Sequence, residues 1–72
     1  MITLTYKVYF YVLWTTRGWS RMSVEVVVHQ LEDMNEPSKD FMQTAAEFQW
    51  DKEHPIPNYE TIVVYKWEKV NA

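Results

Sequence analysis

The stretch ITLTYKVYFYVLW, residues 2–14, alternates between two kinds of side chain with a period of two. Successive side chains of a β-strand point to opposite faces of a sheet, so this period predicts a strand. One face is an unbroken apolar series: Ile2, Leu4, Tyr6, Val8, Phe10, Val12 and Trp14. The other is mixed and aromatic: Thr3, Thr5, Lys7, Tyr9, Tyr11, Leu13 and Thr15. Because these residue types suit a pleated surface, we expect this stretch to be the long central strand of a small sheet.

The residues that follow predict a hairpin. Gly18 is the only glycine of the chain and lies in a polar run, so we expect a turn at about Thr16 to Ser20 with Gly18 at positive φ. Trp19 either folds back onto the end of the sheet or stands out as a contact residue.

A return strand is expected at about Arg21 to Leu31, again with two distinct faces. Its core face would carry Met22, Val24, Val26 and Val28. Glu25, Val27 and His29 would lie on the opposite face. A slip of one residue would bury Glu25, so the register should be well fixed.

A polar connector at residues 32–38 then leads into a helix that reaches about Asp51. Ser38 is a good N-cap; alternatively Asn35 or Glu36 caps and Pro37 lies in the first turn. The expected apolar stripe is Phe41, Ala45, Phe48 and Lys52, with Met42 and Ala46 beside it. Trp50 is about half a turn from Phe41, so we expect it to be exposed or past the end of the regular helix.

Two prolines in the segment HPIPN, residues 54–58, should end the helix. Tyr59 to Val70 then reads as the last strand, with apolar residues on both of its faces. The order strand, strand, helix, strand with a long first strand favours an α+β fold. We expect one domain over residues 1–72: a three-stranded antiparallel sheet of order 2-1-3 with one helix on one face.

Composition limits the classes of function. There is no cysteine, which excludes disulfides and thiolate metal sites and fits a reducing cytoplasm. The net charge is −3 with only seven Lys and Arg, which makes nucleic acid an unlikely partner. No stretch approaches the roughly 20 apolar residues that span a bilayer, so no membrane partner is expected.

Candidate catalytic or metal-binding groups are weak. His29 is followed by Glu32 and Asp33, and His54 follows Asp51 and Glu53, but neither spacing matches a known ligand or catalytic motif. We therefore expect no enzyme activity, no catalytic residues, no metal and no cofactor.

One helix can cover only one face of the sheet, so the other face should lie open. We expect it to bind a protein partner or a second copy through Tyr9, Tyr11, Leu13, Val27 and Trp67. An open apolar face larger than a few hundred Å² is unusual in a monomer. The alternative is that these are ordinary scattered surface aromatics, shielded by the stems of Lys7 and Arg17.

The chain resembles very small β-hairpin–helix–β proteins found in phage and prophage gene clusters. The resemblance lies in VYF at 8–10, TRGW at 16–19, KDF at 39–41, IVV at 62–64 and Trp67. Most such proteins have no known function; those that are understood bind and block a host protein or assist assembly. The resemblance implies no active site that could be carried over.

These observations predict a small protein-binding module. It would act by contact through its open aromatic sheet face or a strand edge, with a phage-type inhibitor of a host protein as one form of that activity. The alternatives are a homodimeric structural protein and, less favoured, a single-stranded nucleic-acid binder that stacks bases on Tyr9 and Tyr11.

Overall fold

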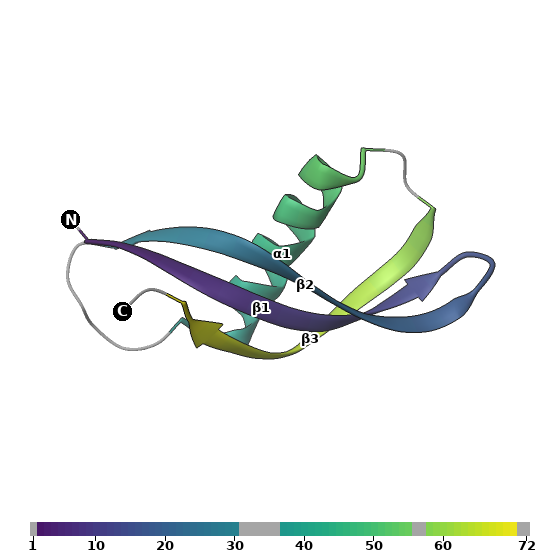
Figure 1. Cartoon of the computed structure of the whole chain (residues 1–72), viewed down its shortest axis with the longest axis horizontal. Coiled ribbons are helices and arrows are strands. Elements are labelled where there is room, and N and C mark those ends of the chain that lie inside the picture. Colours follow the sequence, from purple (N-terminus) through teal and green to yellow (C-terminus); the bar gives the residue numbers. More distant parts are fainter. Residues whose placement is uncertain (1, 31–36, 56–57, 71–72) are drawn as a thin grey trace.

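The computed structural model describes residues 2–30, 37–55 and 58–70. The strands are β1 (Ile2–Trp14), β2 (Gly18–Gln30) and β3 (Tyr59–Lys69), and the helix is α1 (Lys39–Glu53). The sheet is antiparallel with the order β2-β1-β3, and α1 lies across one of its faces (Figure 1). The predicted α+β fold, strand order and central position of residues 2–14 are confirmed.

The β1–β2 hairpin is regular along its whole length. Every residue of β1 from Ile2 to Trp14 is paired in one register, which ends with Trp14 opposite Gly18. Gly18 has a φ of 80° and is, in the described part of the chain, the one residue with positive φ. The turn is shorter than predicted, at residues 15–17, so β2 begins at Gly18 rather than at Arg21.

The β1–β3 pairing contains two irregularities. Tyr9 pairs with Lys66 whereas Phe10 pairs with Val64, so Tyr65 between them has no partner on β1. Such an extra residue is a β-bulge, and it exchanges the faces of all residues beyond it. A second shift separates the Leu13–Thr61 pair from the Trp14–Tyr59 pair.

The helix begins where the cap chemistry predicted. Ser38 has extended backbone, and its Oγ accepts a 3.2 Å hydrogen bond from the Phe41 N–H. Asp40 lies in the first turn, where a carboxylate favours the positive end of the helix dipole. The alternative caps Asn35 and Glu36 lie outside the described residues, and Pro37 precedes the helix.

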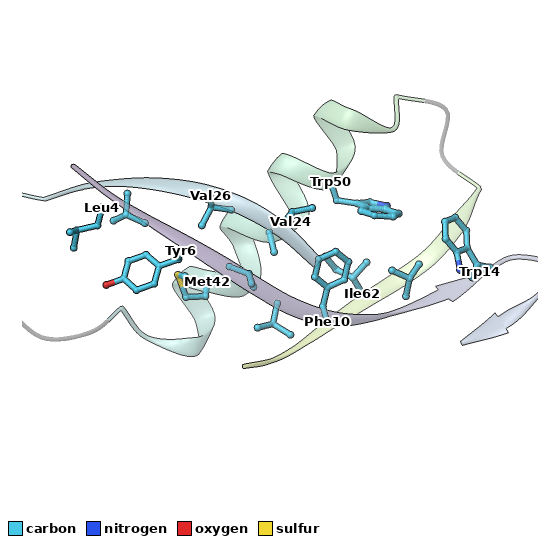
Figure 2. Close-up of a cluster of buried hydrophobic side chains, with 14 residues drawn as sticks. Leu4, Tyr6, Phe10, Trp14, Val24, Val26, Met42, Trp50 and Ile62 are labelled. Carbon is cyan, nitrogen blue, oxygen red and sulfur yellow. The ribbon is translucent and has the colours of Figure 1, made fainter. Parts of the chain in front are cut away.

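The predicted buried stripe of the helix is wrong. The side chains of α1 that are buried are those of Met42, Ala46 and Trp50. Phe41 and Phe48 remain 49% and 71% exposed. Trp50 lies inside the helix with 1% exposure, because its ring fills the space above Phe10 and Trp14, with centroids 5.5 and 5.8 Å away (Figure 2).

The core is a single layer between the sheet and α1 (Figure 2). The even-numbered series of β1 and β2 supply most of it, as predicted. Its buried members are Leu4, Tyr6, Val8, Phe10, Val12, Trp14, Val24, Val26, Val28, Met42, Ala46, Trp50, Ile62 and Val64. The opposite face of the sheet therefore carries the odd-numbered residues of β1 and β2.

Candidate contact surface on the open sheet face

The side of the sheet that faces away from α1 is called the open face here. It is built from the odd-numbered residues of β1 and β2 and from the β3 residues that pair with them. Four of the five predicted contact residues lie on it: Tyr9, Tyr11, Leu13 and Val27.

Trp67 does not share this face. It pairs with Val8, whose side chain is fully buried in the core, and it packs against the core cluster. Strict alternation would put Trp67 on the same side as Val63 and Tyr65, but the bulge at Tyr65 shifts the phase of β3. Trp67 is thus corrected to the helix side of the sheet.

Three tyrosines form a connected cluster at the centre of the open face. The Tyr65 ring lies 4.6 Å from the Tyr11 ring and 6.4 Å from the Tyr9 ring, measured between centroids. Both pairs are tilted, at 32° and 43°, as the quadrupoles of aromatic rings prefer over a flat sandwich. The three rings therefore form one connected aromatic surface.

Charged groups surround Tyr9. The Lys66 and Lys7 ammonium groups lie 4.8 and 5.4 Å from its ring centroid, within the range of cation–π attraction. The Tyr9 hydroxyl donates a 2.6 Å hydrogen bond to Oε1 of Glu68. That hydrogen bond raises the pKa of Tyr9, because a phenolate beside a carboxylate would be repelled, so the hydroxyl remains a donor at neutral pH.

Further apolar side chains extend the surface on both sides of the cluster. Val63 lies opposite Tyr11 and is exposed, and Val27 is 57% exposed. Trp19 lies opposite Leu13 and is 56% exposed. It therefore stands out from the sheet rather than folding back onto its end. The open face therefore has an apolar and aromatic band with Lys7, Arg21, Lys66, Glu25 and Glu68 around it.

Sequence reasoning missed Tyr65 and Val63 as members of this surface. Both series of the strand are apolar between Ile62 and Tyr65. Alternation along the strand therefore does not show which series faces the core or where the bulge lies.

The two histidines are held by separate structural contacts at opposite ends of the sheet. The His29 Nδ1 lies 3.2 Å from the Thr3 hydroxyl. His54 caps the C-terminus of α1, and its ring stacks on Trp50 with centroids 3.9 Å apart. Within residues 2–30, 37–55 and 58–70, no three His, Cys, Asp or Glu side chains converge as a metal site would require. The carboxylates of Glu32 and Asp33 lie outside the described residues.

A hollow of about 310 Å³ lies where β2 ends and α1 begins. Its lining consists of Val28, His29, Pro37, Ser38 and Phe41. Its two polar side chains are already engaged, since the Ser38 hydroxyl caps the helix and the His29 ring meets Thr3. The hollow is mainly apolar and offers no convergent polar groups to a ligand.

Comparison with protein-family models, with curated proteins and with solved structures gives no significant match. In the part of the chain that the structure describes, no helix is long and apolar enough to cross a bilayer. Function must therefore be inferred from the surface itself.

Proposed function

We propose that this chain is a small protein-binding module that acts by contact through its open sheet face. The observation that supports this most is the Tyr9–Tyr11–Tyr65 cluster, which stands on the face opposite α1. Tyr11 and Tyr65 remain 39% and 42% exposed although each packs against the other. Among the described residues, no element lies over them.

The arrangement has the features of a protein interface. Tyrosine and tryptophan supply large contact areas with few rotatable bonds, and interface cores favour aromatic residues while charged residues gather at the rim. Here Tyr11, Tyr65 and Val63 are central, and Lys7 and Glu25 lie to the side. Since the rings already pack on one another, little side-chain freedom remains to be lost on binding.

The partner class we propose first is a protein of a phage host, whose surface the module would cover. The resemblance to small phage and prophage proteins supports that class. A contact-only activity also suits a chain of 72 residues in which both histidines are occupied by structural contacts.

Single-stranded nucleic acid is the competing partner. Bases stack on exposed aromatic rings of a sheet, and Lys7 and Lys66 lie beside Tyr9. However, Glu68 accepts the hydrogen bond from that same tyrosine, and Glu25 lies opposite Lys7. These two carboxylates oppose a phosphate backbone beside the tyrosine cluster, so a protein is favoured.

The test compares two glutamate substitutions of equal charge. Immobilised wild-type chain, Tyr11→Glu and Thr44→Glu are each exposed to host lysate, and recovered proteins are then purified and titrated against all three. Thr44 lies on the exposed side of α1, which makes it the matched control. We expect Thr44→Glu to bind like the wild type and Tyr11→Glu to lose binding.

Two results would overturn the proposal. One is equal binding by Tyr11→Glu, which would place the contact elsewhere. The other is binding of a labelled mixed-sequence oligonucleotide that is lost in Tyr11→Glu and in high salt, which would replace the protein partner with nucleic acid.

A further inference from the structure

The two edges of the sheet differ in how they are protected. At the β3 edge, the Gln43 side-chain amide donates a 2.8 Å hydrogen bond to the Ile62 carbonyl and accepts a 2.9 Å bond from the Val64 N–H. Gln43 thus satisfies two outer backbone groups of β3 as a neighbouring strand would. The two bulges of β3 protect this edge further, since bulges interrupt strand addition.

The β2 edge has neither kind of protection. Its 13 residues pair with β1 in one unshifted register and contain no proline. Of the hydrogen bonds among the described residues, none joins the backbone of β2 to a group outside β1. A long, regular, uncovered edge strand is a template for another strand.

The backbone orientation of β2 follows from the Gln43 contacts. Because Ile62 and Val64 direct their groups outward to Gln43, Phe10 opposite Val64 directs its own groups toward β2. Phe10 pairs with Met22, so the even-numbered residues of β2 bond to β1. The odd-numbered residues, Ser23 among them, therefore direct their N–H and C=O groups to the free edge.

We propose that two copies of this chain pair through β2, antiparallel, about a two-fold axis at Ser23. Antiparallel pairing about this axis would join the two sheets into one continuous sheet. Both helices would lie on one side of it and both open faces on the other. The proposal concerns an edge rather than the open face and does not depend on the proposed function.

The register at Ser23 is the one in which side chains match. It places Arg21 of each copy opposite Glu25 of the other, which gives two opposite-charge pairs. It also places the exposed Trp19 opposite Val27 and Met22 opposite Val24. Aromatic and β-branched residues directly opposite each other are favourable cross-strand pairs.

Neighbouring registers match less well. An axis at Glu25 would set two glutamates directly opposite each other. An axis at Val24 would set Val27 opposite Arg21 and Trp19 opposite His29. An axis between two residues would exchange odd and even positions, which would place the apolar core series beside the open face.

Phe41 marks the side of α1 that lies toward this edge. Gln43 reaches toward β3, and at about 100° per residue Phe41 projects roughly 160° away from it around the helix. Phe41 accordingly lines the same hollow as Val28 of β2.

The first experiment measures molar mass by sedimentation over a concentration series. The wild type is expected to rise from 8.7 kDa toward twice that mass. Arg21→Glu and Glu25→Arg should each weaken the dimer about tenfold or more, since two opposite-charge pairs become two like-charge pairs. An equimolar mixture of the two variants should dimerise again, because each supplies the charge that the other lacks.

The second experiment tests the axis itself. The chain has no cysteine, so Ser23→Cys introduces a single thiol that would lie opposite its own copy, at about 5.5 Å between Cα atoms. That separation allows a disulfide. Ser20→Cys is the matched control, because its two copies would be roughly 20 Å apart at about 3.4 Å per residue. Mild oxidation should link Ser23→Cys chains and leave Ser20→Cys chains single.

Either of two results would overturn this proposal: a wild type that stays at 8.7 kDa at every concentration, or a dimer that both charge reversals leave unchanged. Urea unfolding of each variant is measured at a protein concentration too low for dimers to form. It shows whether a substitution weakens the dimer contact or unfolds the single chain. Because Tyr11 is not at this edge, failure here leaves the lysate test of the open face unaffected.

Discussion

Tyr65 packs against Tyr11 on the open face, with 4.6 Å between ring centroids, although the register shift between Tyr9 and Phe10 leaves it without a partner on β1. The bulge that leaves Tyr65 unpaired also turns its ring onto the central strand. Without this extra residue, the open face would have two neighbouring tyrosines of one strand rather than a three-ring cluster. The bulge is thus part of the candidate surface and not only an irregularity of the sheet.

The contact between Tyr11 and Tyr65 should be measurable as a coupling energy. In a double-mutant cycle with Tyr11→Ala and Tyr65→Ala, we expect the two effects on the free energy of unfolding to differ from additivity by about 0.5–1.5 kcal/mol. Urea unfolding measures each variant. Tyr11→Ala combined with Val27→Ala is the control pair and should be additive; additivity in both pairs would contradict the cluster.

Alanine substitutions can test which face of α1 is buried: the face of Trp50, or the face of Phe48 that helical periodicity predicted. Trp50→Ala should lower the free energy of unfolding by about 3–5 kcal/mol, because it empties the space above Phe10 and Trp14. Phe48→Ala should change it by less than about 0.5 kcal/mol, because that side chain is exposed. The comparison is made by urea unfolding at low protein concentration, and equal losses would contradict the assigned faces.

Gln43 should contribute more to the free energy of unfolding than a glutamine on the exposed surface of α1. Gln43→Leu leaves the Val64 N–H and the Ile62 carbonyl without partners, which we expect to cost about 1–2 kcal/mol. The control is Gln49→Leu, because Gln49 donates a hydrogen bond to Glu53 on the helix surface. This substitution should lower the free energy of unfolding by less than about 0.5 kcal/mol. Amide exchange at Val64 should accelerate in Gln43→Leu alone; unchanged exchange there would argue against the edge role.

The Tyr59 hydroxyl should make the free energy of unfolding fall at alkaline pH. Burial, followed by its hydrogen bond to Asp51, raises the pKa of Tyr59 from 10.0 to about 12. A raised folded-state pKa contributes stability that is complete below pH 10 and is lost as the pH rises toward 12, because only the unfolded chain ionises in that range. We expect the urea midpoint of the wild type to fall through this window and that of Tyr59→Phe to fall less. An identical fall in both would remove Tyr59 as the cause.

The sheet was predictable from sequence because its signal is strong and redundant. The period of two runs without a break from Ile2 to Trp14, and the even series of β2 matches it across the hairpin. Gly18 marks the turn because it alone adopts positive φ without a steric penalty. These three features agree with one another, so the hairpin and its register follow from the sequence alone.

The helix face was not predictable in the same way. Two stripes of α1 are comparably apolar: Phe41, Ala45 and Phe48 on one, and Met42, Ala46 and Trp50 on the other. The choice depends on the shape of the sheet surface, where Phe10 and Trp14 leave room for an indole ring. Helical periodicity contains no information about that shape.

The candidate site was predicted in part for a related reason. Tyr9, Tyr11, Leu13 and Val27 follow from alternation in strands of regular register. Trp67 was misplaced and Tyr65 was missed because one bulge changes the face of every later residue in β3. A bulge is decided by strand pairing, which a count of alternating residues along one strand does not contain.

A photo-reactive amino acid at residue 65 tests the open face most directly. It is compared with the same amino acid at residue 44, on the exposed side of α1, in living cells that produce the chain. We expect position 65 to crosslink to a distinct partner protein and position 44 to give none of that product. Crosslinks of equal yield from both positions, or none from position 65, would contradict the assignment of the open face as the contact surface.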